Sequence, residues 1–244
     1  MIEKFFEGVK YEEVDVQGRI VRFPVRYIDQ TRISVTLTAS TERVRKALPS
    51  VKLEPVEINK GTTTISLMAF EYREIDSLSP YNEFGTFVPV LCKAKPDDSG
   101  LPGVFCFHLP VTTERARFGG VEIYGFPKFV AEITFKDLGD SLSCHVWHDG
   151  KDIATIRVRK IEAATRKWVD YCYTVRNGRI LRTFLQAHGL VGTSNLEGGA
   201  SIELGSHPVA EELRQLEIGQ SPIQYSYMPK VQSLLHRPSE NFPI

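Results

Sequence analysis

Segments with the composition of β-strands follow one another along almost the whole chain, and this feature limits the possible folds most. Residues 32–39 (RISVTLTA) are rich in β-branched residues and alternate in part between polar and apolar positions. Residues 62–72 (TTTISLMAFEY) are apolar on both alternations in their second half, which predicts a strand with both faces covered. Asp149-Gly150 and Asn177-Gly178 supply the positive φ angles that tight hairpin turns need. Similar segments cover residues 18–28, 103–111, 128–135, 141–161 and 168–185. We therefore predict a mainly β protein with a large antiparallel sheet or a closed barrel.

Helix signals are few. Residues 40–49 (STERVRKALP) offer Ser40 or Thr41 as an N-cap before a short run of helix-forming residues. Residues 206–219 offer Ser206 as an N-cap, followed by a proline in the first turn and two glutamates near the positive end of the helix dipole. We expect these helices to cap the sheet.

The length and composition suit one globular domain with a sizeable core. Of the 244 residues, 42% are hydrophobic and 25% are charged, as in ordinary globular proteins. We therefore expect a single domain over residues 1–244. Basic and acidic residues number 30 each. This balance argues against binding to nucleic acid or to a membrane, because both kinds of partner favour a basic surface.

The chain shows no signal for export. Residues 1–15 (MIEKFFEGVKYEEVD) are too charged for a signal peptide, and no apolar run is long enough to span a bilayer. The four cysteines are widely spaced and form no CxxC pair. We interpret them as reduced thiols, which predicts a cytoplasmic protein. Glycine-rich nucleotide-binding motifs are also missing from the sequence, so we expect no cofactor.

The segment CHVWH offers Cys144, His145 and His148 as potential metal ligands. If this segment is a strand, His145 and His148 point to opposite faces, whereas zinc needs converging ligands. We therefore predict no metal site here.

One lysine stands in an unusual place. Within residues 121–133 (VEIYGFPKFVAEI), Lys128 has apolar neighbours on both sides. Lysine is rarely buried without a partner, because an ammonium is costly to remove from water. Desolvation favours the neutral amine, which is the form that attacks a ketone to give an imine. The competing interpretation is a lysine whose stem covers apolar surface while its ammonium reaches solvent.

The segment GVEIYGFPKFVAEI resembles the part of the acetoacetate decarboxylase family that carries the Schiff-base lysine, with the approximate pattern G-R-E-x-x-G-[FY]-P-K-K. The matching positions are Gly120, Glu122, Gly125, Phe126, Pro127 and Lys128. Residues 41–49, 79–90 and 198–219 resemble further segments of the family, and all four follow in the family's order.

The resemblance implies a cone-shaped β-barrel wrapped by a larger antiparallel sheet, with few helices, in a homo-oligomer. It also implies a carbon–carbon lyase without a cofactor, in which Lys128 forms a Schiff base with a small keto acid. Glu83 would be the active-site carboxylate that acts as acid or base, with Tyr81 beside it in the substrate site. Arg32 is our candidate for holding the substrate carboxylate, because a guanidinium can donate two hydrogen bonds to it.

The chain departs from the family pattern where the family carries charges. Phe129 replaces the second lysine of the Lys-Lys pair, and Val121 replaces the arginine of G-R-E. Ser66 stands at the position of a second acidic residue. Gln30 stands where the family has an arginine, two residues before Arg32. We expect Gln30, Ser66 and Phe129 to belong to the substrate site, with the imine-forming residues kept and the decarboxylation machinery altered.

Three functions are consistent with these residues. The first is a lyase that decarboxylates a β-keto acid through a Schiff base on Lys128. The second is a Schiff-base aldolase-dehydratase acting on a pyruvate-like substrate. The third is a non-catalytic protein that binds a small molecule in the same barrel pocket, with Lys128 in a salt bridge. Trapping an imine separates the third function from the other two, and product analysis separates the first from the second.

Overall fold

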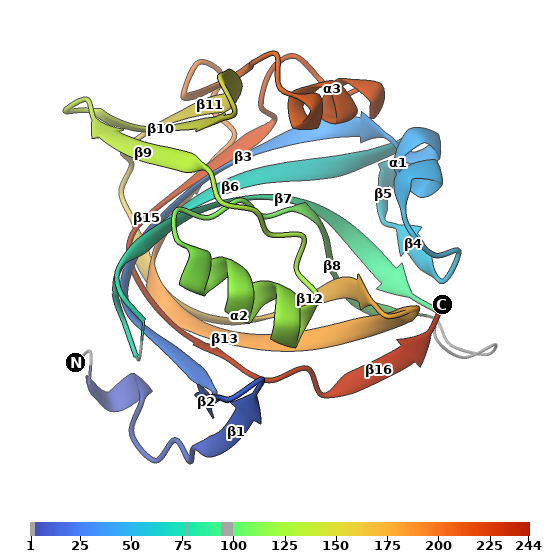
Figure 1. The fold of residues 1–244 in the computed structure, drawn as a ribbon. Coiled ribbons are helices and arrows are strands. Elements are labelled where there is room, and N and C mark those ends of the chain that lie inside the picture. The colour runs from blue at the N-terminus through green and yellow to red at the C-terminus, as the bar shows by residue number, and fades with distance from the viewer. Residues whose placement is uncertain (1–2, 77, 94–99) are drawn as a thin grey trace.

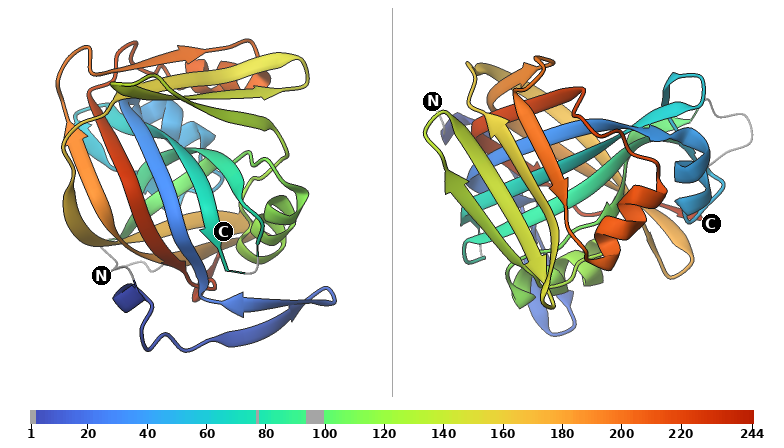
Figure 2. Two further views of the ribbon diagram at one scale, coloured as in Figure 1. Left: turned by 90° about the vertical axis from the view of Figure 1, so that its left-hand side faces the viewer. Right: turned by 90° about the horizontal axis from the view of Figure 1, so that it is seen from above.

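Most of the chain forms one large sheet that closes on itself. The computed structural model describes residues 3–76, 78–93 and 100–244. Its ten-stranded sheet has the order β4-β7-β8-β12-β13-β15-β3-β6-β5, and β16 pairs with β13. Because β6 also pairs with β7, a ring of strands closes into a barrel, and Figure 1 and Figure 2 show helix α2 at one end of it. The ring consists of β3 (Val25–Ser40), β6 (Thr62–Ile75), β7 (Tyr81–Cys92), β8 (Leu101–His108), β12 (Ala164–Arg176), β13 (Arg179–Ser194) and β15 (Gln224–Leu235).

Shorter elements complete the fold. Outside the ring, the large sheet is extended by β4 (Leu53–Pro55), β5 (Glu57–Asn59) and β16 (Glu240–Pro243). A separate four-stranded sheet contains β9 (Glu132–Asp137), β10 (Ser141–His148), β11 (Lys151–Arg159) and β14 (Ala200–Leu204). A hairpin consists of β1 (Glu12–Val16) and β2 (Arg19–Phe23). Figure 2 shows the four-stranded sheet on one side of the barrel and the hairpin on another.

Two clusters of buried side chains fill the fold. One lies between the barrel and the four-stranded sheet, where alternate residues of β3 and β6 such as Ile33, Val35, Ile65 and Leu67 are fully buried. The other lies on the side of α2 (Glu114–Tyr124) and contains seven aromatic residues: Phe23, Tyr27, Phe70, Tyr72, Tyr81, Tyr124 and Phe126. The period-two alternation of these strands is what the sequence led us to expect.

The mainly β fold with a barrel is confirmed, and so are both hairpins. Asp149-Gly150 joins β10 to β11 and Asn177-Gly178 joins β12 to β13, with positive φ at all four residues. The large sheet is mixed, because β8 pairs with β12 in parallel. The single strand expected over residues 18–28 is wrong. It breaks at Pro24, whose nitrogen carries no hydrogen and cannot join a ladder.

Both predicted helices exist, and a third was not predicted. Helix α1 (Thr41–Ala47) begins after Ser40, whose Oγ accepts a hydrogen bond from the Arg43 backbone N–H. Helix α3 (Pro208–Gln215) has His207 as its N-cap, so the expected cap Ser206 is wrong by one residue. Helix α2 was missed. A short 3₁₀ turn covers Glu3–Phe5. Across residues 3–76, 78–93 and 100–244, no helix is both long and apolar enough to cross a membrane.

Candidate active site

The end of α2 leads directly into the lysine segment. Gly125 adopts the left-handed conformation at φ 65°, which favours glycine. Its N–H donates to the Val121 carbonyl at 3.2 Å, and the Phe126 N–H donates to the Gly120 carbonyl at 3.0 Å. These two bonds end the helix and turn the chain sharply, so that Lys128 returns alongside α2.

The backbone on both sides of Lys128 is held by residues 109–111. The Leu109 N–H donates to the Pro127 carbonyl at 3.2 Å, and the Val111 N–H donates to the Phe129 carbonyl at 2.9 Å. The lysine itself therefore lies in an extended loop before β9, not in the strand expected over residues 128–135. Hydrogen bonds to the neighbouring segment fix the loop and so aim the side chain.

Lys128 and Glu83 form a buried ion pair. The Lys128 Nζ donates to Glu83 Oε2 at 2.5 Å, and the two side chains are 6% and 8% exposed. The second carboxylate oxygen, Oε1, accepts a hydrogen bond from the Tyr72 hydroxyl at 3.1 Å. Glu83 lies on β7 and Tyr72 on β6, two strands that pair directly. The pair therefore joins the barrel wall to the loop after α2.

Aromatic rings surround the ammonium. The Lys128 Nζ lies 5.7 Å from the Tyr81 ring centroid and 5.8 Å from that of Phe126. The Tyr81 hydroxyl lies 3.3 Å from the Tyr27 hydroxyl. Burial raises the pKa of Tyr72 and of Tyr81 well above the ordinary value, with nearby Glu83 adding to the shift. Both hydroxyls are therefore protonated at neutral pH and can donate hydrogen bonds.

Gly120 makes room for the lysine stem. A Cβ atom placed on Gly120 would overlap Cδ and Cε of Lys128, although the helix conformation itself would accept a side chain. By contrast, a Cβ atom on the preceding Gly119 would meet nothing within 4 Å. The missing side chain at Gly120 thus lets the lysine cross the helix closely on its way to Glu83.

Arg32 is buried on the same side of the sheet as Tyr72. Its Nε donates to Gln30 Oε1 at 2.8 Å, one terminal nitrogen donates to Ser233 Oγ at 3.1 Å, and only 4% of the residue is exposed. The guanidinium lies over the Phe70 ring, 5.3 Å from its centroid. Burial lowers the pKa of Arg32, while Tyr72, Asp170 and Glu83 oppose that shift. The positive charge of Arg32 thus has neutral hydrogen-bond partners.

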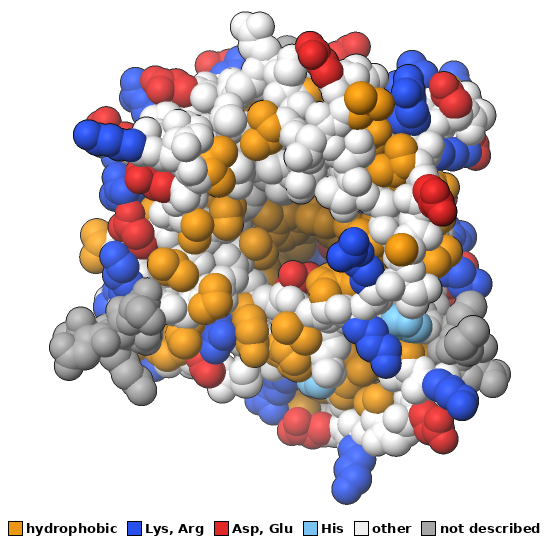
Figure 3. Space-filling model, turned by 180° about the vertical axis from the view of Figure 1, so that it is seen from behind, with side chains coloured by type: hydrophobic (Ala, Val, Ile, Leu, Met, Phe, Trp, Pro, Cys, Tyr) orange, Lys and Arg blue, Asp and Glu red, His pale blue; other side chains and the backbone are white. Residues whose placement is uncertain are grey.

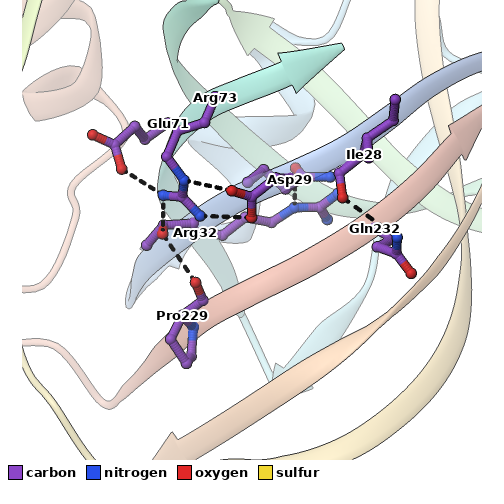
Figure 4. A network of polar contacts seen from close by, with 9 residues as sticks. Ile28, Asp29, Arg32, Glu71, Arg73, Pro229 and Gln232 are labelled. Atoms are coloured by element: carbon purple, nitrogen blue, oxygen red, sulfur yellow. Dashed lines mark hydrogen bonds and ion pairs between the residues drawn. The ribbon is translucent and has the colours of Figure 1, made fainter. Parts of the chain in front are cut away.

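A different arginine, Arg73, lies on the opposite face of β3. Figure 4 shows Arg73 bonded to Asp29 and Glu71, away from the guanidinium of Arg32. The Asp29 pairing uses two nitrogens of Arg73 at 2.9 Å each, and the Glu71 contact is 2.7 Å. Acidic partners therefore occupy Arg73, which leaves Arg32 as the better placed of the two to meet an anion.

The other predicted site residues lie in different places. Gln30 holds Arg32 and also donates to Ser233 Oγ at 2.8 Å. Ser66 shares a 2.9 Å hydrogen bond with Thr36, and it lies four residues along β6 from Phe70, which pairs with Glu83. The ring of Phe129 points away from Lys128 and toward two histidines. Its centroid lies 4.9 Å from that of His148 and 6.2 Å from that of His207.

The structure thus brings Lys128, Glu83 and Tyr81 together. Arg32 lies with Gln30 on β3, and Phe129 lies apart from both groups. Sequence reasoning missed Tyr72 and the role of Gly120. Tyr72 could have been found, since it follows Ser66 at an even spacing on the same predicted strand. The role of Gly120 depends on α2, which was not predicted.

The CHVWH segment brings its residues to separate partners. Cys144 is buried in the core, and burial raises the pKa of its thiol. His145 lies 2.6 Å from Asp152, and His148 lies 3.0 Å from His207. Within the part of the chain that the structure describes, no three His, Cys, Asp or Glu side chains are grouped as a metal site requires.

The molecule is also hollow on its far side. Figure 3, seen from behind relative to Figure 1, shows a deep recess whose walls are mainly hydrophobic. An acidic side chain and a basic one are visible near its opening. A recess with apolar walls and few charged groups is a typical setting for a small-molecule site.

The barrel, the buried ion pair and the recess together define a β-barrel protein with a candidate small-molecule site. The family model described as acetoacetate decarboxylase (ADC) matches residues 15–238. The chain belongs to the acetoacetate decarboxylase family.

Relatives and solved structures agree with this assignment. An acetoacetate decarboxylase of Burkholderia mallei (strain NCTC 10229) is 29% identical over 122 residues, which are 49% of this chain and 44% of that protein. The chain thus matches less than half the length of this curated relative.

Among solved structures, the acetoacetate decarboxylase of Legionella pneumophila has a TM-score of 0.65 at 16% identity, covering 100% of this chain and 94% of that one. The enduracididine biosynthesis enzyme MppR, complexed with the condensation product of pyruvate and imidazole 4-carboxaldehyde, has a TM-score of 0.63 at 11% identity. That match covers 90% of this chain and 88% of the other. At these identities, the structures show a shared fold.

Proposed function

We propose that this protein is a carbon–carbon lyase that forms a Schiff base between Lys128 and a small keto acid. The observation that carries the proposal is the buried pair of Lys128 and Glu83, joined at 2.5 Å. A buried amine beside a carboxylate has both groups that imine formation needs, a nucleophile and a group that moves protons. Membership of the acetoacetate decarboxylase family supports the same reaction class.

The chemistry follows from the geometry of the pair. Glu83 takes a proton from the Lys128 ammonium, and the neutral amine attacks the keto carbon of the substrate. Loss of water, with a proton returned from Glu83, leaves a cationic imine. In a β-keto acid the bond to the carboxylate then breaks, carbon dioxide leaves, and the bonding electrons pass into the imine to give an enamine. Protonation of the enamine and hydrolysis release the ketone and restore Lys128.

Arg32 is proposed to attract the substrate carboxylate. Asp170 also acts on the charge of Arg32, although neither hydrogen-bond partner that holds the guanidinium is an acid. A buried guanidinium whose hydrogen-bond partners are the neutral Gln30 and Ser233 gains from an anion, because an unpaired buried charge is costly. Trp168 also lies beside it, with its ring centroid 5.8 Å from Cζ of Arg32.

A second candidate reaction is aldol condensation followed by dehydration, from a pyruvate-like substrate and an aldehyde. Two observations favour it over simple decarboxylation. Val121 and Ser66 are neutral where the family pattern carries charges, and the MppR structure, which shares the fold, holds a condensation product of pyruvate. Each lost charge-assisted hydrogen bond costs about 1.5–3 kcal/mol, or about one to two decades in rate. Acetoacetate is therefore expected to be a poor substrate.

Borohydride trapping tests the proposal. Reduction in the presence of pyruvate or acetoacetate is expected to leave a stable mass adduct on the peptide that contains Lys128, with slow release of carbon dioxide from acetoacetate in the same sample. Lys128→Ala should abolish the adduct. The matched control is Lys160→Ala, which removes a surface lysine paired with Asp137 at 2.6 Å and should leave the adduct yield unchanged.

Each result has a definite meaning. An unmodified Lys128, or adducts spread over surface lysines, rules out the Schiff base and leaves the non-catalytic binding protein. Rapid release of carbon dioxide that depends on Lys128 would identify the protein as an ordinary decarboxylase. It would also exclude the aldol reaction as the main activity. Condensation products with an aldehyde partner select the second reaction.

A further inference from the structure

A second, smaller cavity reaches Lys128 from the side of the β1–β2 hairpin. It has a volume of about 110 Å³ and lies between the hairpin, α2 and the adjoining ends of β3 and β6. Its lining includes Lys128 and Tyr81 together with Gly119, Tyr124 and Ile123 of α2. The cavity therefore has the lysine of the proposed reaction in its wall.

The charges that line this cavity are unbalanced. Arg19, Arg22 and Arg115 line it, and Asp76 is the acidic residue among its lining side chains. Asp76 is paired with Arg26 at 3.1 Å, and Arg22 is paired with Glu13 at 2.8 Å.

Two guanidinium groups of the cavity form no ion pair with an acidic side chain in the described part of the chain. Arg19 lies over the ring of Phe118, 4.2 Å from its centroid. Arg115 takes part in none of the ion pairs found among residues 3–76, 78–93 and 100–244. Both residues are exposed, so they can meet an anion that arrives from solvent.

A polar atom within the lining also has no partner. Tyr124 is only 4% exposed, and its hydroxyl oxygen forms no hydrogen bond with any described residue. Buried hydroxyl groups in folded proteins almost always have a hydrogen-bond partner. A ligand with a polar group would supply one.

We propose that this cavity binds the part of the substrate that lies beyond its carbonyl, and that the substrate is a keto acid with a distal carboxylate. The inference rests on the proposed function, because it places the reacting carbonyl at Lys128. The short chain would occupy the apolar wall formed by α2, and the distal carboxylate would reach Arg19 and Arg115. An apolar cavity of about 150 Å³ accommodates a benzene ring, so this one has room for a chain of about four to five heavy atoms.

Hexanoate is a suitable probe, because it has the chain and the carboxylate but no keto group. Isothermal titration calorimetry is expected to show that hexanoate binds the wild-type protein, and that hexanol, without the charge, binds at least about tenfold more weakly. Binding should also weaken as salt is added, since exposed guanidinium groups are screened.

Three variants locate the site. Gly119→Leu fills the cavity from a position where a Cβ atom meets nothing within 4 Å, so it should abolish binding. Helix α2 should tolerate the change, because leucine favours a helix more than glycine does. Arg19→Gln combined with Arg115→Gln should weaken binding at least about tenfold. The control is Arg117→Gln, on the same helix but paired with Glu114 and outside the cavity lining, and it should bind as the wild type does.

Unchanged hexanoate affinity in Gly119→Leu, or equal affinities for hexanoate and hexanol, would overturn the inference. A folded protein is confirmed for each variant by its melting curve, and the arginine variants decide the matter if the leucine variant does not fold. Because hexanoate cannot form an imine, its binding does not depend on Schiff-base chemistry. Failure of imine trapping alone therefore removes the proposed function, and failure of hexanoate binding alone removes this inference.

Discussion

Two features of its surroundings hold Lys128. Its side chain is buried, and the Glu83 carboxylate lies 2.5 Å from its Nζ. The apolar sequence around the lysine predicted the burial, whereas Glu83 is distant in the chain and was named from the family resemblance. Under the proposed function, the free amine forms when Glu83 accepts a proton from Lys128. The hydrogen bond that Tyr72 donates to Glu83 therefore helps to position the carboxylate that would accept this proton.

Gly120→Ala is the sharpest test of how the lysine is placed. Alanine normally stabilises a helix interior by about 1 kcal/mol relative to glycine. Here the added methyl group overlaps the lysine stem, and such overpacking costs about 1–3 kcal/mol. We expect the imine adduct on Lys128 to form at least about tenfold more slowly, with no gain in melting temperature.

Gly119→Ala is the matched control for stability. Its Cβ atom meets nothing within 4 Å, so this variant should melt at a higher temperature than the wild type. If Gly120→Ala gained the same stability and formed the imine adduct at the wild-type rate, the result would contradict the prediction. The position of the Lys128 side chain would then not require a glycine at residue 120.

At the scale of single elements, helix α3 begins at a histidine that can titrate. The Nδ1 atom of His207 accepts a hydrogen bond from the Val209 N–H at 3.2 Å, so this nitrogen carries no proton. The neutral ring therefore has its hydrogen on Nε2, which donates to Nδ1 of His148 at 3.0 Å. Burial lowers the pKa of His207, and the neighbouring His148 adds to the shift.

This arrangement predicts a loss of stability in weak acid. A histidine with a lowered pKa in the folded state binds protons more readily when unfolded, so the free energy of unfolding falls as the pH drops below the ordinary value of about 6.5. Protonation of Nδ1 also removes the N-cap, which is worth about 1 kcal/mol. Melting curves between about pH 7.5 and about pH 5.5 should show this decrease.

His207→Asn separates the cap from the titration. Asparagine caps a helix and does not ionise, so the variant should lose less stability than the wild type over the same pH range. Some dependence on pH should remain, because burial also lowers the pKa of His108. An identical pH profile for the variant would show that His207 is not responsible.

Helix α2 marks where local reasoning failed. The Gly119-Gly120 pair has low helix propensity, and the segment shows no strong helical pattern. The structure explains Gly120, which accommodates the lysine, but gives no reason for a glycine at Gly119. By contrast, β3 and β6 were foreseen, because residues 32–39 and 62–72 are rich in β-branched residues.

At the scale of the whole molecule, strand patterns do not specify which strands pair. Residues 62–72 have a strand pattern whatever their partner is, and the ring closes through the contact of β6 with β7, a strand that the sequence analysis did not predict. The parallel pairing of β8 with β12 is likewise invisible in a local pattern. The barrel was therefore expected from the family resemblance, whereas the residues by themselves left a sheet and a barrel equally open.

The β1–β2 hairpin should be the least stable part of the wall around the smaller cavity. It forms a two-stranded sheet of its own, and such hairpins are marginal in water. Its contacts with α2 include a 2.9 Å hydrogen bond from Gln17 to Glu122 and the stacking of Arg19 on Phe118. Hydrogen exchange should be much faster for amides of residues 12–23 than for those of residues 62–75. Equal protection of the two segments would contradict this order.

The pairing of β3 with β15 has a consequence for how the chain folds. These strands lie near opposite ends of the sequence, with Gln224 opposite Thr36 and Leu235 opposite Val25. During synthesis, the β3 edge that β15 will cover stays unpaired until residues 224–235 have left the ribosome. Contacts between residues so far apart in sequence slow folding, because the entropy of closing a long loop must be lost first. Ring closure is thus a late event, and a pairing-competent strand edge stays exposed while residues 41–223 are synthesised.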